Sequence, residues 1–483
     1  MINAVRWKST MEILTPEEIN AIHEASLHIL ETTGIVMPLA DAKYDYLVEL
    51  GCKVNREKKR VFFSPNVIED ALKKAPSSYA LFARNPENDL FLDGAHGYLT
   101  LDGCGNQVID IDTGEVRASS KESLGQAIKL ADFLPQIAFL WPCVSAQDCN
   151  PRLQPLHELH AMLLNSSKHI QAMTAVDPLN AQGTIDIAAA VVGGRENLKK
   201  RPIISNFQCS ISPLSYDGHG LEAAAIFAEA GVPTGFMIMP IGCSTAPATL
   251  AGEIALGNAE IIAGMAFLQI FYPGTPTFYG SCATMMELKR GGVTCGGPED
   301  FILQGAGAQM AHFYKVPANI GTFATGAKAS DWHAGVENSI SGAVSMFSKS
   351  DMMCGAGLIN GARIFSFEQC VMDCEIYEVL RRVAQGCDIN PETLALEVIH
   401  KVGPQNHYMV EEHTLKHIRD VWQPAVMDRS LYDEWAARGK PSPDQIARDR
   451  AKEILAQHQP MELQNAQSVK EIIAEYEKKY PIS

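Results

Sequence analysis

The side chains best suited to chemistry gather in one short stretch, Thr325–Glu337, which reads TGAKASDWHAGVE. Within it, Lys328, Asp331 and His333 offer a cation, a carboxylate and an imidazole. The apolar run Ala318–Phe323 precedes the stretch, so we expect it to be a loop that leaves a buried strand. These residue types fit a cofactor site, a catalytic site or a polar loop, and the stretch alone leaves all three open.

Short apolar runs alternate with segments of helical length from Gly97 onward. The predicted strands are Tyr98–Leu101, Ile137–Val144, Ile170–Val176, Pro202–Phe207, Thr234–Pro240, Thr275–Tyr279, Ala318–Phe323 and Met352–Ile359. The helices expected between them include Lys121–Phe133, Leu153–Leu164, Ala181–Val192, Gly220–Ala230, Thr249–Phe267, Glu299–Phe313, Gly335–Phe347 and Ser366–Val383. Eight such units predict an α/β fold, a closed (β/α)8 TIM barrel. The glycine-rich motifs of nucleotide-binding sheets do not occur.

The chain outside these units divides into two further parts. We expect residues 1–96 to form a helical and mixed segment packed on the barrel, and residues 97–390 to form the barrel itself. Its first helix starts at Thr15-Pro16, where a capping residue precedes proline. Residues 391–483 are rich in charged and amide side chains, and we expect a helical extension that covers the barrel or a neighbouring subunit.

Charge and composition exclude several classes of protein. The formal net charge of −16 argues against nucleic acid as the partner. The amino terminus lacks the apolar core of a signal peptide, and we find no run near the length of a membrane span. The 12 cysteines are scattered between Cys52 and Cys387 without paired metal-ligand spacing. We therefore expect reduced thiols, no metal site and a cytoplasmic location.

Active sites of such barrels lie where strands end, so the residues that follow each predicted strand are the candidates. The candidate site residues are Tyr98, Gln171, Asn206, Phe278, Phe323, Lys328, Asp331, Trp332, His333, Phe367 and Glu368. This predicted rim is polar but lightly charged, and aromatic residues recur on it. Aromatic faces and weak dipoles suit a quaternary ammonium ion, which has no N–H to donate.

Several longer stretches match one family. They include GCSTAPATLAG at Gly242–Gly252, the later Asn258-Ala259-Glu260, Ala327–Gly335 and Ser366-Phe367-Glu368. Over about residues 10–390 the chain resembles the trimethylamine methyltransferase family of corrinoid-dependent methyltransferases.

The resemblance implies a (β/α)8 barrel that moves a methyl group from a methylated amine to the Co(I) of a corrinoid. That corrinoid would be presented by a separate small corrinoid protein, with none tightly bound by this chain. Founding members place a pyrrolysine in the barrel, and this chain has none, so it resembles the branch that demethylates quaternary amines. Glycine betaine is favoured over proline betaine, carnitine and γ-butyrobetaine. We also expect a homo-oligomer.

Within that resemblance, His333, Asp331 and Tyr98 are the expected catalytic residues. The carboxylate of a betaine would be anchored by Lys328, by His333 or by backbone N–H groups at a helix start. The sequence Asp331-x-His333-Ala334-Gly335 nearly spells the cobalt-ligating motif D-x-H-x-x-G, but its glycine comes one residue early. We therefore do not expect His333 to bind cobalt.

Two other functions stay open on the sequence. A metal- or acid/base-dependent barrel hydrolase would use Asp331, His333 and Glu368. A non-catalytic betaine-binding protein would bind its ligand without turnover.

Overall fold

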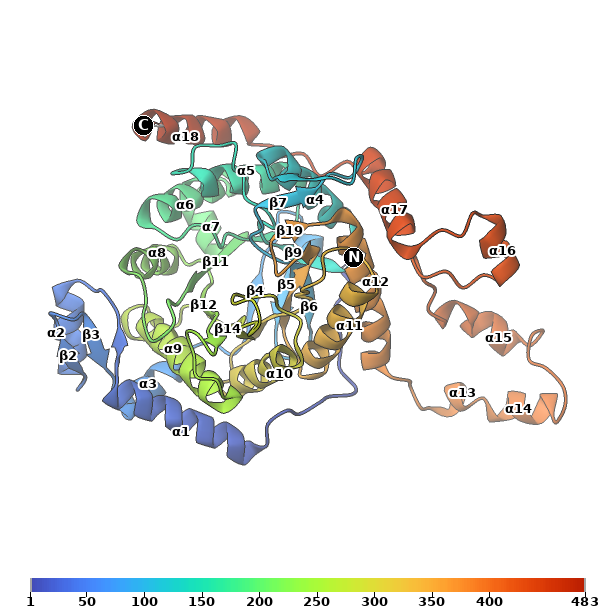
Figure 1. Cartoon of the computed structure of the whole chain (residues 1–483), viewed down its shortest axis with the longest axis horizontal. Helices are drawn as coiled ribbons and strands as arrows, with labels where there is room; N and C mark the ends of the chain where they lie inside the picture. The colour runs from blue at the N-terminus through green and yellow to red at the C-terminus, as the bar shows by residue number, and fades with distance from the viewer. Residues whose placement is uncertain (1, 482–483) are drawn as a thin grey trace.

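A computed structural model describes residues 2–481, which form a closed parallel barrel ringed by helices (Figure 1). The strands are β6 Tyr98–Leu101, β9 Ile137–Leu140, β10 His169–Gln171, β11 Ile204–Cys209, β12 Thr234–Ile238, β14 Tyr279–Ser281, β16 Ala318–Gly321 and β17 Met352–Ala356. They pair in the order β10-β11-β12-β14-β16-β17-β6-β9. Each predicted run contains or overlaps one barrel strand, which confirms the predicted (β/α)8 fold. The sixth run was placed too early, because the strand begins only at Tyr279.

The helices around the barrel lie close to the predicted segments. They are α4 Lys121–Phe133, α5 Gln154–Asn165, α6 Pro178–Val192, α7 Arg195–Lys200, α8 Gly218–Glu229, α9 Leu250–Phe271, α10 Pro298–Phe313, α11 Trp332–Phe347 and α12 Phe367–Gln385. Several begin at a side chain that accepts a backbone N–H of the first turn; these caps are Ser120, Asp177, Asp217, Asp331 and Ser366. Such caps fix the points at which the loops turn into helices.

Helix α9 corrects the expectation that no run approaches a membrane span. Within residues 2–481 it is the one helix that is long and apolar enough, with 22 residues and a mean hydropathy of 1.6 in its most apolar window. However, 83% of that window is buried inside the protein. The N-terminal helices α1 (Pro16–Thr32) and α3 (Pro65–Leu72) pack against it, so burial in the core accounts for its composition.

The N-terminal segment contains strands as well as helices. Helix α2 spans Asp41–Glu49, and β1 (Ile35–Val36), β3 (Arg60–Phe62) and β2 (Lys53–Asn55) form a small sheet. The hairpin of β4 (Tyr79–Leu81) and β5 (Leu90–Leu92) places leucines in the cluster that fills the barrel interior. A 3₁₀ turn, Pro86–Asn88, joins the two hairpin strands. The hairpin covers the amino end of the barrel, so the opposite end is left for ligands.

Two small sheets lie among the loops at the carboxyl ends of the barrel strands. One contains β18 (Leu358–Ile359), β19 (Ile364–Phe365), β7 (Gln107–Ile109) and β8 (Val116–Ala118). The other pairs β13 (Ile241–Gly242) with β15 (Thr284–Met285). These sheets give the loops regular backbone partners near the candidate site.

The C-terminal extension leaves the barrel and then returns to it (Figure 1). Helices α13 (Pro391–Leu394), α14 (Leu396–Val402), α15 (Glu412–His417) and α16 (Tyr432–Ala437), with a 3₁₀ turn at Ile418–Asp420, form an outlying arm. Helix α17 (Pro443–Gln457) then packs on α12 and α4, and α18 (Ala466–Lys479) packs on α6 and α5. We call residues 387–442 the arm.

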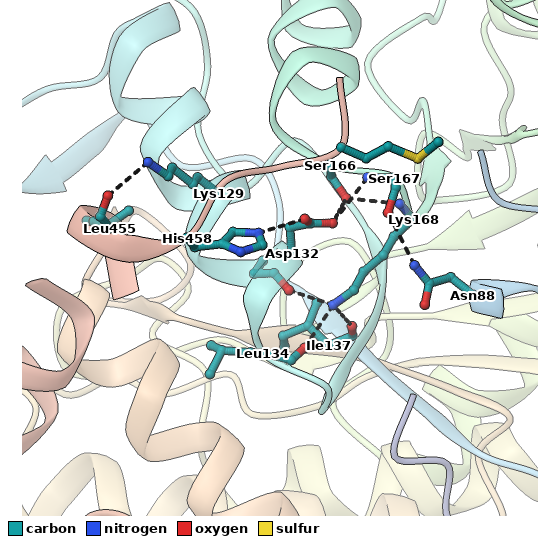
Figure 2. A network of polar contacts seen from close by, with 12 residues as sticks. Asn88, Lys129, Asp132, Leu134, Ile137, Ser166, Ser167, Lys168, Leu455 and His458 are labelled. Carbon is teal, nitrogen blue, oxygen red and sulfur yellow. Dashed lines mark hydrogen bonds and ion pairs between the residues drawn. The ribbon is translucent and has the colours of Figure 1, made fainter. Parts of the chain in front are cut away.

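A buried lysine joins two elements at the amino side of the barrel (Figure 2). The ammonium of Lys168, only 3% exposed, donates to the carbonyl oxygens of Ala131, Leu134 and Ile137 at 2.7, 2.8 and 2.6 Å. Two of these carbonyls lie at the end of α4, where no further helical N–H reaches them. Lys168 therefore caps α4 and ties it to the start of β10.

The same network reaches the C-terminal extension (Figure 2). Asp132 of α4 accepts the hydroxyl of Ser166 at 2.7 Å and lies 2.8 Å from Nε2 of His458. Lys129 donates to the carbonyl of Leu455 at 2.8 Å. These contacts hold the end of α17 on the barrel.

We expect Lys168→Met to destabilise the protein by about 3 kcal/mol at pH 7, because three buried carbonyl groups lose the ammonium as a donor. Burial lowers the pKa of Lys168 to about 8. Between that value and the pKa of the unfolded lysine, the unfolded chain holds more protons, so this group makes stability rise with pH. The difference in thermal unfolding midpoint between the native protein and Lys168→Met should therefore be larger at pH 10 than at pH 7. Lys129→Met, which removes one half-buried contact, is the matched control; equal losses in both variants would contradict the capping role.

Candidate active site

Buried carboxylates hold the loops at the carboxyl end of the barrel. Glu158 on α5 accepts the backbone N–H of Ala146 at 3.1 Å and the hydroxyl of Thr174 at 2.7 Å, so it joins two neighbouring loops. Glu260 on α9 accepts Ser212 and the N–H of Leu214, both at 2.8 Å. These loops follow β9, β10 and β11.

Buried carboxylates also hold loops on the other side of the barrel. Asp300 on α10 accepts the N–H of Met285 at 3.0 Å, and Asp373 on α12 accepts the N–H of Gly357 at 2.9 Å. Burial raises the pKa of both carboxyls, to about 7 for Asp373, while the hydrogen bonds oppose that rise. The carboxylate oxygens accept hydrogen bonds from the loop backbone, so few acidic side chains remain to face the barrel opening.

The stretch Thr325–Glu337 begins as the loop after β16, as predicted, but α11 starts at Trp332, three residues before the predicted helix start at Gly335. Asp331 caps α11 by accepting the N–H of His333 at 2.9 Å. Glu337 accepts the N–H of Gly326 at 2.9 Å and lies 2.8 Å from Nε2 of His333. Lys328 donates to the carbonyl of Gly326. These polar groups brace their own loop at the rim, and Trp332 beside them is 81% exposed.

Sulfur atoms and one carboxyl form the floor of the barrel opening. Alternation along the strands turns inward Asp102, Met173, Cys209, Met239 and Cys282, each at or just past the end of its strand and each reached by solvent. We call these five residues the mouth floor.

Two glycines leave room for the sulfur side chains of the mouth floor. A Cβ atom on Gly103 would lie 2.8 Å from Sδ of Met173, and one on Gly321 would lie 2.8 Å from Sγ of Cys282. The Sγ of Cys282 also lies 3.4 Å from Sδ of Met237 below it. The surrounding protein raises the pKa of Cys209, although solvent reaches this thiol at the barrel opening.

Asp102 is the carboxyl of the mouth floor. It differs from the bracing carboxylates, which hold the loops: Glu158, Glu260, Asp300 and Asp373. Its Oδ1 accepts the N–H of Gly103 at 2.8 Å, and no side-chain donor within residues 2–481 reaches the carboxylate. The other oxygen is open to solvent, since it has no partner and is not enclosed. Burial of the group raises its pKa to about 7. The sequence placed Asp102 after the first strand, but nothing in its local pattern marked it above its neighbours.

Tyr98 and Phe278 lie at the other end of the barrel, which corrects their predicted role. Tyr98 opens β6, is 5% exposed, and its hydroxyl lies 3.3 Å from the backbone of Phe91 in the covering hairpin. Phe278 is 1% exposed and stacks edge-on against Phe207. Both belong to the packed interior and do not reach the carboxyl rim.

Gln171 and Asn206 are buried without facing the opening. Asn206 donates to the carbonyl of Ala172 and accepts Gln208, whose side chain reaches the helix layer, so the residue faces outward. Gln171 faces inward and lies 3.4 Å from the amide of Asn319 on the opposite side of the barrel, below the mouth floor. Asn206 is a wrong prediction, while Gln171 lies one layer below the residues that solvent reaches.

Phe323, Phe367 and Glu368 are structural in this fold. Phe323 and Phe367 are 0% and 1% exposed and join the core between barrel and helices. Glu368 is 2% exposed and pairs with Arg448 of α17. This pairing contradicts the hydrolase alternative, which needs Glu368 free at the rim. Within residues 2–481, no group of three His, Cys, Asp or Glu side chains is arranged to hold a metal ion.

A parallel eight-stranded barrel whose accessible groups gather at the carboxyl ends of its strands defines a (β/α)8-barrel enzyme. The sequence profile of the trimethylamine methyltransferase (MTTB) family matches residues 2–480. The chain therefore belongs to this family and is a methyltransferase.

Known proteins similar to this chain match it over most of its length. It is 30% identical to the trimethylamine methyltransferase MttB of Desulfitobacterium hafniense, over 97% of this chain and 94% of that protein. It is 33% identical to a glycine betaine methyltransferase of the same species, over 93% of each chain. The crystal structure of the Methanosarcina barkeri monomethylamine methyltransferase superposes with a TM-score of 0.53 at 12% identity, covering 91% of this chain and 92% of that one. That last similarity supports the barrel fold.

We expect Glu337→Ala to lower kcat/KM about tenfold, because the loop loses the acceptor for Thr325 and Gly326. His333→Ala should change kcat/KM by no more than about twofold, since its ring is half exposed and contacts Glu337. Initial rates of methyl transfer measure both. A loss of more than about tenfold in His333→Ala would instead support the predicted contact between His333 and substrate.

Proposed function

We propose that this chain moves a methyl group from a quaternary amine, with glycine betaine favoured, to the Co(I) of a corrinoid carried by a separate small protein. The observation that carries the proposal is the mouth floor, where four sulfur side chains and a single carboxyl share the barrel opening. The glycine betaine methyltransferase at 33% identity adds support from the comparisons.

The chemistry of a quaternary ammonium ion fits such a floor. The ion has no N–H, so hydrogen-bond acceptors gain little from it, whereas polarisable thioethers and thiols can contact its methyl groups. The nitrogen loses its positive charge as the methyl departs. Strong fixed negative charge against the nitrogen would therefore favour the bound substrate over the transition state.

The residues of this chain have a positioning task in that reaction. The corrinoid, when presented by its own protein, would supply the nucleophile, and the amine nitrogen would leave uncharged with its lone pair, so no general acid is needed. The braced loops hold the mouth floor in place, and the open carboxyl face lets the acceptor protein approach. The methyl group must point out of the barrel for this approach to succeed.

A panel of methylated amines with free cob(I)alamin tests the function. We expect methyl transfer from glycine betaine with the highest kcat/KM, lower values for proline betaine, carnitine and γ-butyrobetaine, and none from trimethylamine. The measurement is the absorbance change of cob(I)alamin on methylation under anaerobic conditions. Activity on trimethylamine alone would overturn the proposal, and any methyl transfer overturns the non-catalytic alternative.

We also propose that the chain works as a homo-oligomer in the cytoplasm, where its 12 free thiols stay reduced. The arm supports the oligomer, because it leaves the barrel and returns (Figure 1) with large apolar side chains exposed. These include Leu396 at 67%, Met409 at 77%, Val410 at 76% and Leu431 at 73% exposure. A second copy of the chain is the occupant that would cover them.

Sedimentation of the purified chain should therefore show a species larger than the monomer. The double variant Met409→Glu, Val410→Glu should shift that species toward the monomer, since two charges would be buried in the contact. Leu288→Glu is the matched control, because Leu288 is 73% exposed on a loop far from the arm in the sequence. A monomeric native chain would overturn the oligomer.

A further inference from the structure

The mouth floor contains one group whose charge can change near neutral pH. Asp102 lies just past the end of β6, and its backbone N–H continues the strand ladder by donating to the carbonyl of Ala356 on β17. Leu99 and Leu101 point to the helix layer, so the alternate positions Tyr98, Thr100 and Asp102 face the barrel interior. Asp102 is thus the topmost inward side chain of its strand.

Asp102 has few partners for a carboxylate in this position. It accepts one hydrogen bond, from Gly103, and its second oxygen stays open. The bracing carboxylates Glu158, Glu260 and Asp373 accept at least three each. A carboxylate that holds no loop in place and faces the barrel opening is suited to binding a ligand.

Among residues 2–481, no cationic side chain pairs with Asp102. The titratable groups that face it are Cys104 in its own loop, Cys354 on β17, Cys295 before α10 and Asp373 on α12. Burial raises the pKa of Cys104 and of Cys295 to about 12, so neither thiol carries charge at neutral pH. A cationic ligand would be the missing partner of the carboxylate.

We propose that Asp102 contacts the cationic nitrogen of the substrate and sets the affinity for the ammonium group, without accelerating methyl transfer itself. This inference rests on the proposed function and assigns the residue of this chain that recognises the positive charge. Attraction between the carboxylate and the ammonium ion is strongest before the reaction, because the nitrogen becomes neutral during transfer. Asp102 therefore acts in binding and specificity, and its removal should affect KM and kcat differently.

The pH dependence of binding follows from the same contact. The ionised form of Asp102 binds the ammonium ion, and burial raises the pKa of the free carboxyl to about 7. Affinity for glycine betaine should therefore rise as the pH increases to about 7 and level off above it. Glycine betaine has no group that titrates in this range. Binding below pH 7 should release protons, which calorimetry in buffers of different ionisation enthalpy measures directly on the native protein.

The decisive experiment compares two ligands on two proteins. Glycine betaine and 3,3-dimethylbutyrate share one shape, but the second has carbon in place of the charged nitrogen. Asp102→Asn keeps the acceptor for Gly103 and removes the negative charge. We expect the variant to bind glycine betaine about tenfold more weakly and without pH dependence, while 3,3-dimethylbutyrate binds no more weakly than to the native protein.

Kinetics and a control variant complete the test. The KM for glycine betaine should rise in Asp102→Asn with kcat unchanged or higher. Asp112→Asn, on the exposed turn between β7 and β8, should leave every value as in the native protein. Equal weakening for both ligands, an unchanged KM, or a fall in kcat alone would overturn the role of Asp102 while leaving methyl transfer intact. If the native protein neither binds nor demethylates any quaternary amine, the proposed function fails, and this inference fails with it.

Discussion

The loops at the carboxyl end of the barrel depend on buried carboxylates that accept their backbone N–H groups. Parallel strands all end at this face, and the irregular chain that follows them has donors without sheet partners. Helix side chains such as Glu158, Glu260, Asp300, Glu337 and Asp373 supply the acceptors. Each acid belongs to a helix that packs on the barrel, so these hydrogen bonds fix the loops relative to the helices.

The protein is acidic overall, but because of this arrangement few of its acidic side chains face the barrel opening. The chain has 56 acidic residues against 40 basic ones, yet the mouth floor contains one carboxyl and four sulfur side chains. Acids that might have faced a ligand point at backbone and are enclosed, which raises the pKa of Glu158, Glu260 and Asp300. A methyl transfer that discharges a cation favours a face of this kind.

The sequence predicted the barrel well because hydrophobic periodicity and helix caps are local properties. Seven of the eight runs and the eight helical segments lie on the observed elements, while the sixth run meets β14 only at Tyr279. Asp331 and Ser366 mark helix starts as capping residues do. The site was predicted poorly, because strand direction and phase decide which end and which face a residue occupies. Tyr98 and Asp102 share one inward face, but four residues separate them by roughly 13 Å along the strand.

Other wrong predictions involve contacts that no local pattern contains. Asn206 and Phe207 are neighbours, and only the register of β11 in the closed sheet turns the first outward and the second inward. Glu368 was predicted to be an acid at the rim, but it pairs with Arg448, which lies 80 residues later in the sequence. Partners that distant depend on how the C-terminal extension packs on α12.

Recognition of a cation and transfer of its methyl group place opposite demands on one site. A permanent carboxylate would bind the ammonium ion well and then oppose the loss of its charge. Burial raises the pKa of Asp102 to about 7, so this carboxyl is partly protonated in the free protein at neutral pH, and a bound cation would favour its ionised form. Once the nitrogen is neutral, the buried negative charge has no partner, and proton uptake from solvent through the open face restores the neutral carboxyl. In the proposed mechanism, the same burial that raises the pKa of Asp102 lets its charge respond to a bound cation.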